Sequence, residues 1–332
     1  MKTRLFTVSF CFLGCLLQAA APDVASVKSY LVSTAERMQS ASEKFVSDSD
    51  AYLVLWKQHA DDAKAVAADP RTEALILAMR EDYKAMDSFG YETIEGIVAG
   101  VPSLGAFDVY LDAGVAQGDG EPDEIAMVVL KLDNGKTVDK EGSLFTLLIE
   151  PALWQSRDNR TIAVPGSETR LPDPWLLSAA AKDVSAKITE LVGAAKAWEP
   201  SPADLFGALI EMTPTLSDYF EEWKESRYAG DESTGLFAAV SRVSDMKGIM
   251  GSCQVMYVAA HPALLAKDPA LANSIHAGFE EILAFIGKLE DREKSRALTV
   301  VEVEELTAQA KSKTDRLVPQ IQQAVAVLEI QL

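Results

Sequence analysis

The feature that most restricts the fold is a long run of helical periodicity near the start of the chain. From Asp23 to Ala67, apolar residues recur at intervals of three and four, and the pattern resumes from Thr72 to Phe89 after a break at Asp69-Pro70. An amphipathic helix must bury its apolar stripe against another element. The N-terminal part of the chain is therefore predicted to form a bundle of long helices.

Helical periodicity returns after Pro174 and continues nearly to the end of the chain, where it predicts about five helices. These predicted helices span residues 175–198, 204–228 with a bend at Thr213-Pro214, 236–259, 270–292 and 299–332. Between them, residues 104–174 are irregular. There, Met127 to Leu132 followed by Asp133-Asn134-Gly135 indicates either a strand entering a hairpin turn or a short buried helix.

The expected fold class is mainly α, with two helical bundles and an irregular middle insertion that contains a short β-hairpin if the strand reading holds. With 332 residues, the length favours two domains over one. We predict a signal peptide over residues 1–20, an N-terminal helical domain with the insertion over 21–170, and a C-terminal bundle over 171–332.

The charge balance narrows the range of partners. The chain has 31 Lys and Arg against 50 Asp and Glu, a net charge of −19. Such a surface repels nucleic acid and anionic lipid, and attracts cations or basic partners. Nucleic-acid binding is excluded on this ground.

The first residues have the pattern of a secretory signal. Lys2 and Arg4 precede an apolar run from Leu5 to Leu17 that is too short for a permanent membrane anchor. We expect a secreted or periplasmic protein without a permanent transmembrane segment. A lipid anchor at Cys15 is not favoured, because the apolar run continues past that cysteine.

Short-range acidic residues are concentrated in one stretch. Glu92 and Glu95 stand three apart between Gly90 and Gly96, and Asp108 and Asp112 stand four apart soon afterwards. If each pair lies on a helix, its two carboxylates share one face and can grip one cation. The alternative for both pairs is a solvated face or a helix cap.

These residues also carry a family resemblance. The box Gly90-Tyr91-Glu92-Thr93-Ile94-Glu95, the stretch Val243 to Ile249, and Asp268-Pro269-Ala270-Leu271-Ala272 after Pro262 resemble the imelysin-like proteins. That family includes iron-regulated periplasmic and outer-membrane proteins and the secreted component of a bacterial iron-uptake system. Its box typically reads Gly-x-His-x-x-Glu, whereas position 92 here is Glu. The resemblance implies two helical bundles, a cleft at the box and a role in iron acquisition.

The substitution at position 92 changes the expected metal. A Glu-x-x-Glu pair offers only oxygen, which favours Fe³⁺, Ca²⁺ or Mn²⁺ over Cu or Zn. Two carboxylates supply too few ligands, so Asp108, Asp112, Tyr91 or water would complete the shell. Arg242 and Asp245, three apart in a predicted helix, are expected to line the cleft or to form a surface ion pair.

Two other groups of residues could bind a metal or take part in catalysis. Met246, Met250, Cys253 and Met256 recur at helical spacing and would suit Cu(I), although such a stripe usually packs in a core. The histidines are His59, His261 and His276, expected at helix ends or on the surface. They form no His-Glu-x-x-His motif, so the peptidase label carried by some family members receives no support.

The sequence thus predicts an exported, non-catalytic protein that binds a metal ion, iron or another divalent cation, for uptake at the cell envelope. An envelope or membrane-transport protein is the expected partner besides the metal. The alternative is a non-catalytic envelope interaction protein in which the box is structural, and a weaker alternative is a peptidase.

Overall fold

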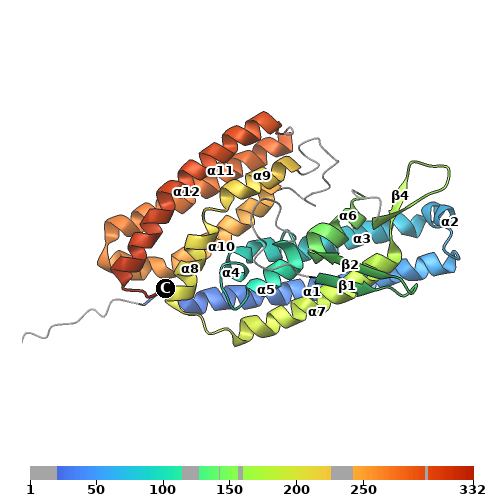
Figure 1. The fold of residues 1–332 in the computed structure, drawn as a ribbon, viewed down its shortest axis with the longest axis horizontal. Helices are drawn as coiled ribbons and strands as arrows, with labels where there is room; N and C mark the ends of the chain where they lie inside the picture. The colour runs from blue at the N-terminus through green and yellow to red at the C-terminus, as the bar shows by residue number, and fades with distance from the viewer. Residues whose placement is uncertain (1–20, 114–126, 142, 156–159, 226–241, 296–297) are drawn as a thin grey trace, which may run out of the picture.

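The computed structural model describes residues 21–113, 127–141, 143–155, 160–225, 242–295 and 298–332. The predicted signal peptide, including Cys15, lies outside the described residues. Within them the protein is mainly helical, with two small antiparallel sheets (Figure 1). The predicted fold class is confirmed.

The N-terminal helices are α1 (Val24–Gln58), α2 (Ala63–Ala68) and α3 (Pro70–Met86). The helical pattern from Asp23 to Ala67 is interrupted after Gln58, because the chain turns sharply at Ala60 and Asp61, whose φ angles are +51° and +60°. Helical periodicity does not predict such a turn, because the apolar spacing continues on both sides of it.

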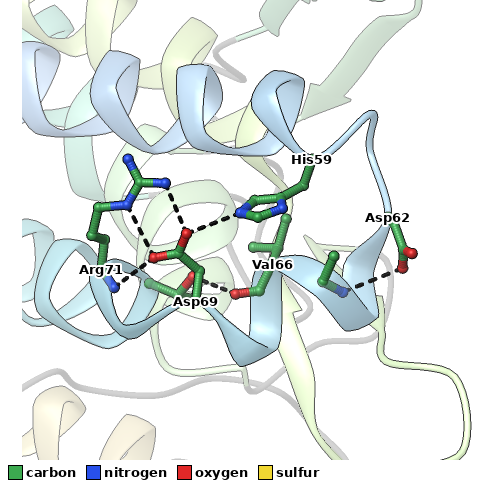
Figure 2. A network of polar contacts seen from close by, with 7 residues as sticks. His59, Asp62, Val66, Asp69 and Arg71 are labelled. Carbon is green, nitrogen blue, oxygen red and sulfur yellow. Dashed lines mark hydrogen bonds and ion pairs between the residues drawn. The ribbon is translucent and has the colours of Figure 1, made fainter.

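A network of hydrogen bonds and ion pairs stabilises this turn (Figure 2). His59 Nε2 lies 2.9 Å from a carboxylate oxygen of Asp69, and the Arg71 guanidinium donates to both oxygens of the same carboxylate. Asp62 accepts from the first amides of α2, and Asp69 accepts from the Arg71 amide at the start of α3. Two helix starts and one helix end are therefore held within a short segment.

The middle of the chain consists of short elements. They are the 3₁₀ turn η1 (Tyr91–Thr93), α4 (Glu95–Val98), α5 (Gly105–Asp108), the π-helix η2 (Val109–Ala113), β1 (Met127–Lys131), β2 (Thr137–Glu141), the π-helix η3 (Phe145–Ile149), α6 (Glu150–Leu153), β3 (Thr161–Ala163) and β4 (Arg170–Pro172). Strands β1 and β2 pair antiparallel, with Met127 opposite Glu141, and Gly135 takes a φ of +82° in the turn. The strand reading is confirmed, and the alternative of a buried helix is wrong.

The remaining helices are α7 (Pro174–Ala197), α8 (Pro202–Met212), α9 (Leu216–Glu225), α10 (Arg242–Lys267), α11 (Pro269–Ser295) and α12 (Val300–Leu328). The region expected as one bent helix is two, α8 and α9, separated at Thr213 to Thr215. Helix α7 packs along α1, while α9 to α12 gather at the other end of the molecule (Figure 1). The division into two domains at residue 171 stays a prediction.

Helix α10 connects the two groups. It packs against α11, α8, α4, η1 and α1. Its segment Val243–Lys267 is the one helix among the described residues that is long and apolar enough to cross a membrane, and 56% of its most apolar window is buried within the protein. A core helix meets the same criteria, so the apolar character of α10 follows from its central position.

Candidate metal centre

The box lies where α3 gives way to η1 and α4. The condition that Glu92 and Glu95 share one helix is not met, because Ile94, with φ −123° and ψ −3°, separates η1 from α4. The two glutamates are nevertheless both buried, Glu92 at 2% and Glu95 at 5% exposure. The reading of this pair as a solvated face is therefore wrong.

Glycines allow the box to approach its neighbours closely. A Cβ on Gly90 would lie 2.3 Å from the Met86 carbonyl oxygen, and one on Gly96 would lie 2.4 Å from Ser252 Oγ of α10. From the other side, a Cβ on Gly248 would lie 3.0 Å from the backbone of Glu92. The glycines that frame the motif thus permit the box to pack directly on α10.

Three carboxylates converge at this point. Asp87, Glu92 and Asp112 each offer one oxygen, and these oxygens all lie within 4.8 Å of one another. Asp87 is the C-cap of α3, and Asp112 belongs to η2. The Thr146 hydroxyl of η3 donates to Asp112 Oδ1 at 2.8 Å, which fixes that carboxylate in place.

Further acidic groups and phenols surround the three. Tyr219 of α9 donates to Glu95 Oε1 at 2.5 Å, and Tyr91 donates to Asp108 Oδ1 at 2.5 Å. Asp245, in the first turn of α10, is 4% exposed and close enough to Glu92 to act on its charge. The neighbourhood therefore offers oxygen donors from several separate elements.

Burial and mutual repulsion set the protonation of the two glutamates. Burial raises the pKa of Glu92 well above its usual value, and the nearby carboxylates of Asp245, Glu95, Asp112 and Asp87 raise it further. Burial likewise raises the pKa of Glu95, with Asp108 and Asp112 adding to the effect. Both groups thus hold protons more readily than ordinary glutamates when no cation is present.

One oxygen of each glutamate lacks a partner. Among the described residues, Glu92 Oε2 and Glu95 Oε2 are inaccessible to solvent and accept no hydrogen bond. An unsatisfied buried carboxylate oxygen is costly, typically about 1–3 kcal/mol or more. A cation would satisfy these oxygens and offset the repulsion among the carboxylates.

The residues predicted from the sequence have different places in this structure. Glu92 and Asp112 converge, whereas Glu95, Asp108 and Asp245 lie around them and Tyr91 is the donor to Asp108. Arg242 begins α10, and its side chain lies outside the described residues.

Asp87 belongs to the cluster although its sequence position does not predict this. Its one signal was an acidic residue at the end of the predicted helix, three positions before Gly90. The helical spacing of acidic residues does not reveal Asp87, because its neighbours Glu92 and Asp112 belong to η1 and η2.

The sulfur stripe is part of the core. Met246, Met250, Cys253 and Met256 are each 0% exposed and pack in the main apolar cluster. Burial raises the pKa of the Cys253 thiol to about 12, and the charge of Glu95 adds to this. A buried protonated thiol is the normal state of a packing cysteine, which favours packing over a Cu(I) site.

The fold and the site together define a class: a mainly helical protein in which a glycine-framed acidic box packs on a central helix beside further carboxylates. The family model Peptidase_M75: Imelysin matches residues 24–328. The chain belongs to the imelysin family, as its box and C-terminal motifs indicated. No curated protein matches the chain.

Proposed function

We propose that this protein binds a hard metal cation, iron first among them, at the cluster of Asp87, Glu92 and Asp112, and that it serves iron uptake at the cell envelope. The observation that carries the proposal is the convergence of three carboxylates within 4.8 Å at a point where the buried Glu92 has an oxygen without a partner. Membership of the imelysin family supports the envelope role.

The donor set fits such a cation. Asp and Glu carboxylates are the ligands of hard ions such as Fe³⁺, Mn²⁺ and Ca²⁺. Glu95 and Asp108 stand next to the three converging groups, and the Tyr91 hydroxyl adds a phenol oxygen that suits ferric iron. The cation is the cargo in this proposal, and the chain's own residues hold it without chemical change.

The exposure of the acidic side chains differs across the cluster: Asp108 and Asp112 are half-buried, whereas Asp87 and Glu92 are buried. We infer that the cation enters from the side of α5 and η2. The half-buried carboxylates meet it first, and Glu92 completes its coordination.

Titration calorimetry tests the proposal directly. The mature chain is titrated with Mn²⁺ and Ca²⁺, and with Fe³⁺ supplied as a weak chelate that prevents hydrolysis. We expect the Glu92→Gln/Glu95→Gln variant to lose at least tenfold in affinity, because Gln removes both charges and keeps the side-chain volume.

A matched control removes the same charge elsewhere. Glu304 and Glu305 are exposed on α12, so Glu304→Gln/Glu305→Gln changes the net charge equally without touching the box. This control should bind as the unmodified protein does. If all three proteins gave the same binding isotherm, the metal site would not lie at the box.

One observation favours the structural alternative. The box packs on α10 at Gly96 and Gly248, so it also holds two groups of helices together. In that reading the protein is an envelope interaction protein, and the Gln variant would be altered in stability while cation binding stayed unchanged or absent. We propose no catalysis under either function, and peptide hydrolysis that depended on Glu92 would overturn both.

A further inference from the structure

A second group of metal-ligand residues lies between α10 and α11. His261 of α10 and His276 of α11 have ring centroids 5.3 Å apart, with 45° between the ring planes. Tyr257 covers one side, with its ring centroid 5.9 Å from that of His261. Two of the three histidines of the chain thus meet, although 15 positions separate them in the sequence.

One ring nitrogen of each of these two histidines is buried without a partner among the described residues. Within the part of the chain that the structure describes, His261 Nε2 and His276 Nδ1 are inaccessible to solvent and make no hydrogen bond. A buried imidazole nitrogen normally has a partner, so two such atoms on adjacent rings need an explanation.

Glu280 prepares one of these nitrogens for a ligand role. Its Oε1 lies 3.4 Å from His276 Nε2, one helical turn along α11. A proton held on Nε2 by this carboxylate leaves Nδ1 with its lone pair free in the neutral ring. At zinc sites, the ring N–H that does not face the metal usually donates a hydrogen bond to a carboxylate or another acceptor.

From this geometry we propose that His261 and His276 form a site for a borderline divalent transition-metal ion, with Zn²⁺ as the representative ion. Zn–N bonds are about 2.0–2.1 Å, so the centroids of two imidazoles on one tetrahedral ion lie roughly 5 Å apart. The observed 5.3 Å matches that requirement. The His276 side chain is 38% exposed, so the site lies close to the surface, and water would supply the remaining ligands.

This site is separate from the carboxylate cluster. His261 follows Asp245 by 16 positions on the same helix, which corresponds to about 24 Å along the axis. The two sites also differ in chemistry, since imidazole nitrogen suits Zn²⁺ and Cu²⁺ whereas carboxylate oxygen suits hard ions. Zinc binding at the histidines does not depend on the proposed function of the box.

Zinc titration in the Glu92→Gln/Glu95→Gln background isolates the histidine site. We expect one Zn²⁺ per chain, a loss of at least tenfold in affinity for His261→Ala or His276→Ala, and about tenfold for Glu280→Gln. His59→Ala is the matched control, because His59 is paired with Asp69 at the far end of α1, and it should bind zinc normally.

Nitrogen NMR of the histidine rings keeps the test valid if a variant fails to fold. Zn²⁺ added to the unmodified protein should shift the ring nitrogens of His261 and His276 and leave those of His59 unchanged. Zinc affinity that is the same in His261→Ala and His276→Ala as in the background, or zinc shifts confined to His59, would overturn the proposal.

Discussion

At the scale of single residues, the burial and mutual repulsion of the acidic side chains destabilise the folded protein at neutral pH. Burial and neighbouring carboxylates raise the pKa of Glu92 and Glu95. Since the folded-state pKa lies above the unfolded value of about 4.3, each group's contribution to stability is complete below that pH. It is lost as the pH rises through the folded-state pKa.

The Glu92→Gln/Glu95→Gln variant should therefore be more stable than the unmodified protein at pH 7 without metal. Each kcal/mol recovered should raise Tm by about 2–4 °C. The difference in stability between the two proteins should shrink as the pH falls towards 4, where Glu92 and Glu95 of the unmodified protein are protonated and therefore uncharged, like the Gln side chains. Calorimetric melting from pH 4 to pH 8 with a chelator present measures this, and a less stable variant at pH 7 would show that the charges hold the fold together.

The sequence revealed some of these residues and not others. Glu92 and Glu95 could be predicted because the box is a local pattern framed by glycines. Asp87 could not, because it joins Glu92 and Asp112 only when α3, η1 and η2 fold together. The contact of His261 with His276 was missed for the same reason, since each was considered singly as a helix-end or surface residue.

At the scale of elements, the packing of the box on α10 can be tested with two glycines of that helix. A Cβ on Gly248 would press on the Glu92 backbone at 3.0 Å, whereas a Cβ on Gly251 meets no atom within 4 Å. Gly251→Ala should stabilise the protein by up to about 1 kcal/mol through helix propensity.

Gly248→Ala should instead destabilise it by about 1–3 kcal/mol and weaken cation binding, because the box must move. Thermal melting and metal titration of both variants check this pair. Equal stability for the two alanine variants would mean that the box does not depend on its close contact with α10.

The turn between α1 and α3 gives a pH-dependent prediction. The Arg71 guanidinium, with His59 and the Arg71 amide, holds the pKa of Asp69 well below its usual range. A lowered folded-state pKa gives stability that is present above the unfolded value of about 3.9 and is lost as the pH falls towards the folded-state value.

Asp69→Asn should therefore lower Tm at pH 7 and lose less stability than the unmodified protein on acidification below pH 4. Melting at pH 7 and pH 3 checks this, with Glu304→Gln as the control for a carboxylate on the surface. A constant difference between Asp69→Asn and the unmodified protein at both pH values would argue that the charge of Asp69 is irrelevant.

Elements were predicted well where periodicity is long. Helices α3, α7, α11 and α12 follow directly from apolar spacing, and the β1–β2 hairpin follows from Asn134-Gly135. The predicted end of α10 at Ala259 is wrong, because the helix continues through Pro262 to Lys267. The break after His59 and the split of residues 91–98 were missed, because left-handed residues such as Ala60 and Asp61 and the geometry at Ile94 are imposed by packing and capping.

At the scale of the whole molecule, the box lies where the helices around α1 meet those around α10. A cation bound there would contact Asp87 at the end of α3, Glu92 on η1 and Asp112 on η2. Binding should thus stabilise the fold as a whole and not one helix alone.

A cation at 100 times its Kd should add about 2.7 kcal/mol. This corresponds to a rise in Tm of about 5–10 °C. The rise should be absent in Glu92→Gln/Glu95→Gln and present in Glu304→Gln/Glu305→Gln. A melting scan with and without Mn²⁺ measures it, and a rise of equal size in both variants would point to nonspecific binding to the acidic surface.

Cation binding at the three carboxylates is tested most directly by an anomalous-scattering crystal structure of the protein loaded with iron or manganese. We expect an anomalous peak bonded to carboxylate oxygens of Asp87, Glu92 and Asp112. Fully occupied metal at another position, with these three carboxylates left without a cation, would contradict it.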